Sequence, residues 1–352
     1  MSSSSVGLRF LLVFFLLACA AVAWNTIHLI RSHHVLPVGD GRHLASYGFD
    51  LSACRIPQEQ LIPSGLPKDG LTRLDNPPFM LADEVLSLNE KIRGKYLVSS
   101  DRVAGVSLNG DTRVYPLRVL CWHEVINDTV GGTPITVTYS PLCDSLVVFS
   151  REVNGEVLEF GVSGLLYNSN LVMYDRRTDA RPESLWSPLQ FRAISGPAAD
   201  RGDVLTPLPC TMTRWDEWKT RYPQSKVIQP SPERLSDYQH DPYGSYQSSD
   251  HLKYPVSPLP SPSELTLKSP LLIVGIHQNT VVIPYSTIEQ HADENGVWKT
   301  EWDGEKIWFS YTAEPPTAQV NFGAFTEPPI TFTAYSYYFA WYALHESIPW
   351  WP

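Results

Sequence analysis

Two Asn-Gly dipeptides constrain the fold of this chain more than any other feature. Asn109-Gly110 separates two apolar, partly alternating stretches at 103–108 and 112–117. Asn154-Gly155 is flanked by stretches of the same kind. Asn-Gly favours the tight turn between two antiparallel strands, because both residues tolerate a positive φ. We therefore expect the first half of the chain to be built from antiparallel hairpins.

Helical spacing interrupts this strand pattern in two aromatic stretches. Within 213–222 the aromatic residues recur on one helical face, and 336–345 repeat that spacing. Thr213 with Asp216 resembles a capping box for the first of these helices. A further short helix is expected at 82–91. We expect the two aromatic helices to pack against a sheet.

The end of the chain repeats the order of the first half. Ile273-Val274-Gly275-Ile276 resembles Val103-Ala104-Gly105-Val106, and Pro284 follows it as Pro116 follows the earlier stretch. This weak repeat indicates a degenerate internal duplication. The predicted fold class is α+β and β-rich, with two related units of antiparallel strands, each closed by an aromatic-faced helix.

The chain divides into five predicted parts. A proline-rich stretch precludes long regular elements and separates the two related units. The parts are a signal peptide or membrane anchor at 1–30, a segment at 31–100 that packs on the core, a first unit at 101–228, a linker or long loop at 229–270, and a second, shorter unit at 271–352.

The N-terminus predicts a location outside the cytoplasm. The stretch from Phe10 to Trp24 is almost continuously apolar and ends in small residues, as in a secretory signal. An extension to Ile30 reaches the length of a membrane span, so a retained anchor is equally consistent. Leu16-Leu17-Ala18-Cys19 also loosely resembles a lipoprotein cleavage site. The protein is thus expected to be secreted or attached to the membrane through this segment.

Charge argues against nucleic acid as a partner. The formal net charge is −10, and Lys and Arg do not cluster anywhere along the 352 residues. A nucleic-acid-binding surface needs such a basic cluster.

A dense group of polar motifs lies between residues 103 and 186. Buried polar groups cost free energy unless they are paired, so the group indicates either a site or a structural network. Its motifs are Trp122-His123-Glu124, Asn127-Asp128, Tyr139-Ser140-Pro141-Leu142-Cys143, Ser163-Gly164, Asn168-Ser169, Met173-Tyr174-Asp175-Arg176 and Ser184-Leu185-Trp186.

Three of these residues are the candidate catalytic groups. His123, Cys143 and Asp175 stand near the ends of predicted strands, and folded sheets bring strand ends together. We expect them to approach one cleft in the first unit. The candidate binding residues around them are Glu124, Asn127, Asp128, Asn168, Arg176 and Trp186.

Two chemistries fit such a cleft. His123, Cys143 and Met173 are the ligand types of a soft-metal site, with copper as the candidate ion. Alternatively, His123 could activate the Cys143 thiol as a nucleophile, with Glu124 or Asp128 orienting the imidazole. The sequence does not select between them.

Each of these residues also has a structural interpretation. A lone histidine is often a hydrogen-bonded core residue, and a free cysteine is often a small buried hydrophobe. Met173 alternates with Leu171 and fits a core position, while Asp175 and Arg176 fit an ion pair or the cap of a turn. A non-catalytic binding or assembly module is therefore the alternative to a metal or thiol site.

The ordered motifs resemble the DUF3179 family, a group of extracytoplasmic proteins without an assigned function. The resemblance covers roughly residues 56–346 and implies membership and architecture, but no reaction. It is carried by Pro67-Lys68-Asp69-Gly70, Asp75-Asn76-Pro77-Pro78-Phe79, Tyr115-Pro116-Leu117, His123-Glu124, Asn127-Asp128, Tyr139-Ser140-Pro141-Leu142-Cys143, Ser163-Gly164-Leu165-Leu166, Asn168-Ser169, Met173-Tyr174-Asp175-Arg176, Ser184-Leu185-Trp186, Gly196 and Phe339-Ala340-Trp341.

Two departures from the family pattern stand out. Ser140 replaces the first cysteine of a paired motif, so Cys143 lacks the partner that a dithiol or disulfide would need. Residues 179–183 resemble a small insertion before Ser184.

Overall fold

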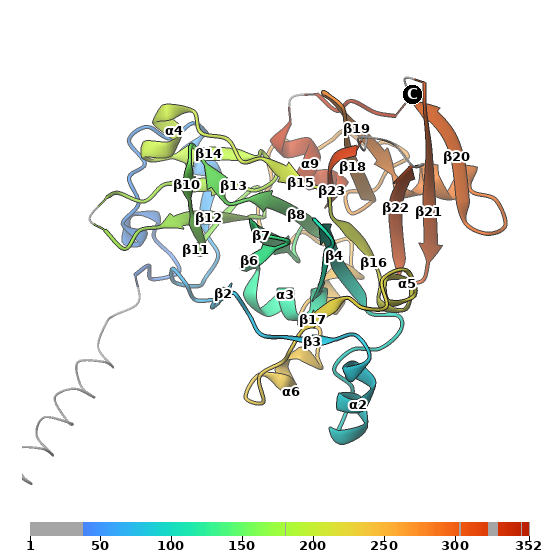
Figure 1. The fold of residues 1–352 in the computed structure, drawn as a ribbon. Helices are drawn as coiled ribbons and strands as arrows, with labels where there is room; N and C mark the ends of the chain where they lie inside the picture. The colour runs from blue at the N-terminus through green and yellow to red at the C-terminus, as the bar shows by residue number, and fades with distance from the viewer. Residues whose placement is uncertain (1–37, 180, 303, 323–329, 346, 352) are drawn as a thin grey trace, which may run out of the picture. The chain divides into compact units, whose positions relative to one another are not determined.

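The fold is β-rich with short helices, in agreement with the predicted α+β class (Figure 1). The computed structural model describes residues 38–179, 181–302, 304–322, 330–345 and 347–351. The described residues from Gly39 onward form one compact unit. The predicted signal or anchor at 1–30 lies outside the described residues. In the described ranges, no helix is long and apolar enough to span a membrane.

An eight-stranded sheet is the largest in the described part of the chain. Its order is β19-β18-β23-β8-β7-β6-β2, and β15 pairs with β8 beside β23. All pairings are antiparallel except that of β2 with β6. The strands are β2 (Leu74–Asp75), β6 (Val125–Val130), β7 (Thr133–Ser140), β8 (Ser145–Ser150), β15 (Pro207–Leu208), β18 (Pro270–Ile276), β19 (Asn279–Pro284) and β23 (Ile330–Tyr337).

Smaller sheets flank this one. Two of them have five strands, in the orders β1-β11-β12-β13-β14 and β16-β4-β5-β17-β3, and two are shorter, β20-β21-β22 and β9-β10. Their bounds are β1 (Leu61–Pro63), β3 (Phe79–Leu81), β4 (Arg102–Leu108), β5 (Asp111–Pro116), β9 (Glu152–Val153), β10 (Glu156–Val157), β11 (Glu159–Tyr167), β12 (Asn170–Arg176), β13 (Leu185–Ser187), β14 (Arg192–Ser195), β16 (Thr211–Arg214), β17 (Lys226–Ile228), β20 (Val297–Trp302), β21 (Glu305–Ala313) and β22 (Pro316–Phe322).

Short helices connect and cover the strands. The α-helices are α2 (Glu84–Lys91), α3 (Leu117–His123), α4 (Pro197–Arg201), α5 (Trp215–Arg221), α6 (Leu235–Tyr238), α7 (Gly244–Gln247), α8 (Tyr285–His291) and α9 (Tyr338–Leu344), and two 3₁₀ turns are η1 (Leu44–Tyr47) and η2 (Gln58–Gln60).

Both predicted hairpins are confirmed. Asn109 and Gly110 have φ of 48° and 80° between β4 and β5, which pair antiparallel. Asn154 and Gly155 have φ of 51° and 78° between β9 and β10. Positive φ at both central residues gives a turn whose twist matches that of the strands it joins.

The predicted helix at 213–222 is present as α5, but its predicted capping box is wrong. The side chain of Thr213 makes no cap, because Thr213 belongs to β16 and its hydroxyl donates to Glu217 at 2.5 Å. Trp215 and Trp218 are buried, as the aromatic face predicts. The pairing of β16 with β4 places Thr213 in a strand, so the capping box that its sequence suggests does not form.

The two halves contain the same order of elements. Hairpin β4-β5 leads through Pro116 into α3, and hairpin β18-β19 leads through Pro284 into α8. In each half a later strand pairs antiparallel with the first strand and runs into an aromatic helix, α5 or α9.

The registers of these pairings differ by two residues. Thr213 pairs with Val103, whereas Ser336 pairs with Leu271 instead of Ile273. A two-residue shift keeps side chains on the same face of a sheet. The internal duplication, with the unit boundaries that depend on it, stays a prediction.

The eight-stranded sheet is buried on both faces. Along β7 and β8, Val137 and Val148 belong to one apolar cluster, while Val147 and Phe149 belong to another. Polar side chains on these strands are consequently also buried, including those of Thr136 and Thr138. Such groups must find hydrogen-bond partners within the protein.

Substitution of Gly105 should test the packing of the aromatic helix. A Cβ at this position of β4 would lie 2.1 Å from the ring of Trp218, so Gly105→Ala should destabilise the protein by about 1–3 kcal/mol. Gly244→Ala is the control, because the nearest atom to its Cβ would be 3.7 Å away. Equal unfolding free energies of both variants in chemical denaturation would contradict the packing.

Candidate functional site

Asn127 is a structural hub. On β6, its amide nitrogen donates to Asp75 at 2.7 Å and to the Phe160 carbonyl at 2.8 Å. Its amide oxygen accepts from the Thr136 hydroxyl at 2.7 Å and from the Phe160 N–H at 3.2 Å. These contacts join β6 to β2, β7 and β11, so this predicted binding residue uses its hydrogen-bonding groups inside the fold.

Asp128, the next residue, is equally engaged. Its carboxylate accepts from the Tyr115 hydroxyl at 2.7 Å and from the Thr129 N–H at 2.7 Å, and Arg113 lies 3.7 Å away. Burial raises the pKa of Asp128, although these partners oppose the shift. The geometry is that of a buried structural carboxylate.

Both ring nitrogens of His123 are occupied. Nδ1 bonds to the carbonyl oxygen of Thr72, which can only accept, so Nδ1 carries the proton. Nε2 then accepts from the Tyr238 hydroxyl at 2.7 Å. Burial is the main cause that lowers the pKa of His123, which favours this neutral form. The histidine therefore joins the end of α3 to α6.

Cys143 is fully buried in the turn between β7 and β8. Burial raises the pKa of its thiol to about 12 and outweighs the hydrogen bonds of Asn170 and Ser140, which lower this pKa. A thiolate nucleophile needs the opposite shift. His123 is bonded elsewhere, so the predicted Cys-His nucleophile pair finds no support.

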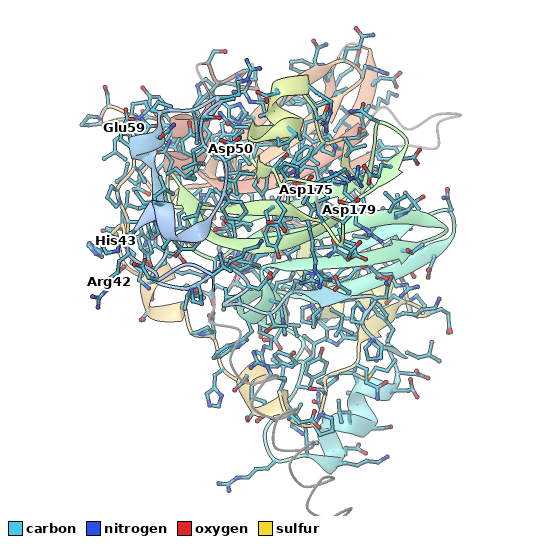
Figure 2. The ribbon with its side chains drawn as sticks, turned by 90° about the vertical axis from the view of Figure 1, so that its left-hand side faces the viewer. Arg42, His43, Asp50, Glu59, Asp175 and Asp179 are labelled. Carbon is cyan, nitrogen blue, oxygen red and sulfur yellow. The ribbon has the colours of Figure 1, made fainter. Side chains whose placement is uncertain are left out.

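Asp175 holds the loop that follows its strand. It lies on β12, and Figure 2 labels it together with Asp179 of that loop. Its carboxylate accepts from the Ser184 N–H and pairs with Arg177 at 2.6 Å. The predicted pairing with Arg176 is wrong, because adjacent residues on a strand point to opposite faces. Arg176 instead lies 3.6 Å from Glu159 and is partly exposed.

The remaining predicted residues also have structural surroundings. Met173 and Trp186 are fully buried and face each other across β12 and β13. Asn168 accepts from the Ser257 N–H at 2.9 Å and donates to the Ala343 carbonyl at 3.3 Å. It thus connects the long loop at 229–270 with α9.

The predicted copper site finds no support. Within the described ranges, no group of three or more His, Cys, Asp or Glu side chains is arranged to hold a metal ion. The described hydrogen bonds and ion pairs do not link His123, Cys143 and Asp175 to one another. Their predicted common catalytic role therefore stays a prediction.

Glu124 differs from these residues. It is 6% exposed, and its carboxyl group has no hydrogen bond or ion pair with the described residues. Burial raises the pKa of Glu124 to about 8. Its side chain lines a cavity of about 230 Å³, which we call the glutamate pocket. It is lined by Ser64, Gly65, Leu66, Leu71, Glu124, Leu142, Val162, Gly164, Leu165, Leu166, Tyr243, Lys253 and Tyr254.

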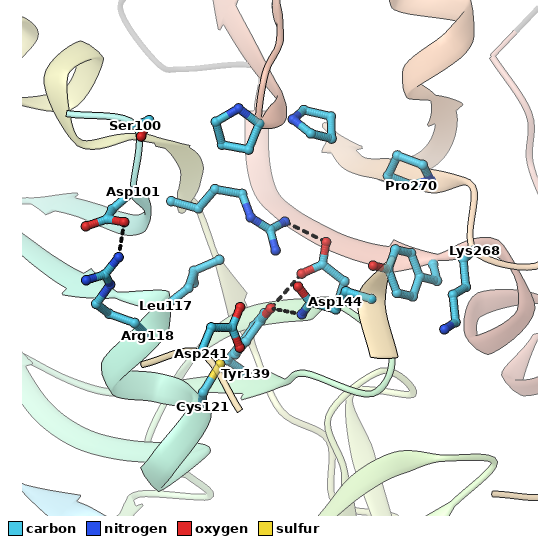
Figure 3. Close-up of a pocket in the computed structure, with 15 residues that line it drawn as sticks. Ser100, Asp101, Leu117, Arg118, Cys121, Tyr139, Asp144, Asp241, Lys268 and Pro270 are labelled. Carbon is cyan, nitrogen blue, oxygen red and sulfur yellow. Dashed lines mark hydrogen bonds and ion pairs between the residues drawn. The ribbon is translucent and has the colours of Figure 1, made fainter. Parts of the chain in front are cut away.

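A second cavity, of about 470 Å³, contains several charged groups (Figure 3). We call it the arginine pocket. Asp101 pairs with Arg118 on one side, and Arg102 pairs with Asp144 at 2.7 Å on the other. It is lined by Ser100, Asp101, Arg102, Leu117, Arg118, Cys121, Tyr139, Asp144, Asp241, Gln247, Lys268, Pro270, Pro315, Pro316 and Tyr337.

Tyr139 and Asp144 connect the polar motif to this pocket. The Tyr139 hydroxyl donates to Asp144 at 2.6 Å and accepts from Gln247 at 3.2 Å. Asp144 has φ of 45°, which directs the chain back into β8. Its position directly after Cys143 was the one sequence signal for this site, and the sequence analysis missed it.

The stretch predicted as a linker or long loop, 229–270, covers this region. It contains the short helices α6 and α7, and its Tyr246 hydroxyl donates to the Leu142 carbonyl at 2.9 Å. Lys268 donates to the Tyr246 and Ser249 carbonyls at 2.6 and 2.7 Å. The stretch is therefore attached to the turn at 141–144.

Comparison with known families supports the resemblance seen in the sequence. The pattern of the family described as "protein of unknown function (DUF3179)" matches residues 68–327. The chain belongs to the DUF3179 family. The match covers most of the chain, including the polar motifs between residues 103 and 186. Ser64, Gly65 and Leu66 of the glutamate pocket and Tyr337 of the arginine pocket lie outside it. Searches of curated proteins and of solved structures found no match.

Cysteine labelling can test the assignment of Cys143. Cys54 is partly exposed, whereas Cys121, Cys143 and Cys210 are buried with raised thiol pKa values. In a Cys19→Ser background, Ellman's reagent should react quickly with Cys54 and slowly with the other three until the protein unfolds. Cys54→Ser should remove the fast phase. A fast phase that Cys143→Ser removes would instead indicate an activated thiol.

Stability against pH can test the burial of Glu124. Its pKa is higher in the folded protein than in the unfolded chain, so the unfolded chain binds fewer protons between about pH 5 and 8. This group should therefore lower the free energy of unfolding as pH rises, by up to about 1.4 kcal/mol per pH unit. His123, with a lowered pKa, contributes the opposite slope below about pH 6.5.

The difference between Glu124→Gln and the unchanged protein isolates the carboxyl group. As pH rises from 5 to 8, the free energy of unfolding of the variant should increase relative to that of the unchanged protein, as measured by urea unfolding. This pH range lies between the pKa of Glu124 in the unfolded chain and its pKa in the folded protein. Glu59→Gln, at an exposed position, is the control. A pH-independent difference for Glu124→Gln would show that the carboxyl group is not desolvated.

Proposed function

We propose that this DUF3179 protein is an extracytoplasmic binding protein for a small polar molecule that carries a carboxylate, and that the ligand occupies the arginine pocket. The volume of about 470 Å³ lies within the range of small-molecule sites, roughly 300–1,000 Å³. The proposed location rests on the apolar segment from Phe10 to Trp24.

The proposal rests on one edge of the Arg102 guanidinium group, whose N–H groups make no hydrogen bond to the described residues. Its Nη1 is held by Asp144 at 2.7 Å and touches the Met212 sulfur at 3.6 Å. Its Nε and Nη2 make no hydrogen bond to the described protein atoms, although Arg102 lines the pocket. These two parallel N–H groups match the two oxygens of a carboxylate.

Neighbouring groups add donors around this edge. Lys268 donates to two backbone carbonyls and lies 3.5 Å from the centroid of the Tyr246 ring, and it adds positive charge to the lining. The Tyr337 hydroxyl lines the same pocket and has no hydrogen bond to the described residues. Asp241 adds a carboxylate to the lining, which suits a ligand that also has a hydrogen-bond donor.

The raised thiol pKa of Cys121 and the hydrogen bond between Tyr139 and Asp144 favour a binding site over a catalytic site. The pKa of the pocket's thiol, Cys121, is raised well above its usual range, mainly by burial. Tyr139 and Asp144 already bond to each other. A nucleophile next to a free general base is the pattern expected of a hydrolytic or transfer site, and the described lining of this pocket does not contain it.

Ligand-dependent stabilisation tests the proposal. Acetate, succinate, citrate, glycine and glutamate would each be added at about 10 mM, and thermal unfolding would be measured. A ligand present at 100 times its dissociation constant stabilises the folded state by about 2.7 kcal/mol. We expect at least one of these carboxylates to raise the unfolding temperature. If all five leave it unchanged, the proposal is wrong.

Variants then locate the site of any carboxylate that binds. Arg102→Gln combined with Asp144→Asn keeps the pair hydrogen-bonded but removes both charges, and should weaken binding at least tenfold in calorimetry. Tyr337→Phe should weaken it several-fold. Arg201→Gln with Asp203→Asn removes a comparable ion pair outside this pocket, and Tyr338→Phe removes a hydroxyl elsewhere. Unchanged affinity in the Arg102 double variant would contradict the assignment.

A further inference from the structure

The glutamate pocket places one buried carboxyl group in a lining of mixed polar and apolar character. Its lining includes five leucines and two tyrosines, Tyr243 and Tyr254, and Glu124 contributes the carboxyl group. The cavity of about 230 Å³ is smaller than the arginine pocket. It therefore suits a small ligand.

The backbone fixes Glu124 in an unusual conformation. This residue ends α3 with φ of 56° and ψ of −32°, a region that residues other than glycine rarely adopt. Its N–H donates to the Leu120 carbonyl at 2.7 Å, and its carbonyl accepts from the Tyr139 N–H at 2.9 Å. Such conformations persist where the surroundings determine them, and they occur often at ligand sites. Here the conformation accompanies a side chain that lines the cavity.

Among the described residues, none forms an ion pair with the Glu124 carboxyl group. An ionised carboxylate that is 94% buried is costly unless a cation or several hydrogen bonds accompany it. Lys253 is the one cationic side chain in the described lining, and it is exposed. Its Nζ lies 5.5 Å from the centroid of the Tyr254 ring and forms no ion pair with Glu124 among the described residues.

We propose that the glutamate pocket binds the primary ammonium group of a small organic molecule, with Glu124 as its counter-ion. The faces of Tyr243 and Tyr254 can stabilise the cation further, since aromatic rings carry negative charge on their faces. The leucine side chains can cover a short alkyl chain attached to the ammonium group. This site is separate from the carboxylate site proposed above and does not depend on it.

The other titratable groups near Glu124 do not replace such a ligand. Burial raises the pKa of Glu124 to about 8, so the empty pocket is mainly neutral at pH 7. A bound ammonium would favour the ionised form. The neighbouring titratable or charged side chains are Cys121, Cys143, Tyr243, Lys253 and Tyr254. Burial raises the pKa values of Cys121, Cys143 and Tyr243, so these three groups supply no charge at that pH.

Charge selectivity is the experiment that tests the site. Butylammonium chloride and pentan-1-ol have similar size and shape, but only the first is charged. With the full-length protein near pH 8, calorimetry should show butylammonium binding at least tenfold more tightly than pentan-1-ol. Equal binding of the two probes, or no binding of butylammonium, would overturn the proposal.

Glu124→Gln should weaken butylammonium binding at least tenfold, because glutamine keeps the size of the side chain and removes its charge. Glu59→Gln is the matched control at an exposed site. Retained affinity in Glu124→Gln would show that the carboxylate is not the counter-ion.

Lys253→Glu provides a test that leaves the core untouched, because Lys253 is exposed. The substitution replaces a repelling charge at the pocket with an attracting one. It should strengthen butylammonium binding several-fold and leave pentan-1-ol unaffected. Unchanged butylammonium affinity, or an equal change for both probes, would place the cation elsewhere and overturn the proposal.

Discussion

The four hydrogen bonds of Asn127 are the interaction on which the arrangement of the sheets depends. Through Asp75, Thr136 and Phe160, this one amide connects three strands of the eight-stranded sheet with β11 of a flanking sheet. Each bond contributes about 1 kcal/mol net, but leaving the buried groups of Thr136 and Phe160 unsatisfied would cost more. The requirement that buried polar groups be paired therefore fixes how the two sheets meet.

Several of the polar motif residues meet this requirement inside the fold, whereas the Glu124 carboxyl group does not. His123, Asp128 and Asp175 have partners that satisfy them inside the fold. Glu124 and the free edge of Arg102 face cavities instead. The polar motif region is thus largely a structural framework, and the two proposed ligand sites rest on Glu124 and on the neighbouring Arg102.

The sequence predicted local structure better than it predicted the site. Asn109-Gly110 and the aromatic spacing of 213–222 determine a turn and a helix through interactions within a few residues, so both were predictable. Arg102 and Asp144 meet only because β4 and the β7–β8 turn come together in space, and no sequence spacing encodes that pairing. The misassigned partner of Asp175 shows the same limit, since strand geometry rather than proximity in sequence selects Arg177.

The stretch 229–270 contributes to both pockets. Its Asp241 and Gln247 line the arginine pocket, and its Tyr243 and Tyr254 line the glutamate pocket. Residues 241 and 243 are separated by a single residue, so a movement of the chain in one cavity changes the wall of the other. A ligand that bound in one of the proposed sites and moved this stretch would therefore change the affinity of the other site, and the coupling free energy would be the same in both directions.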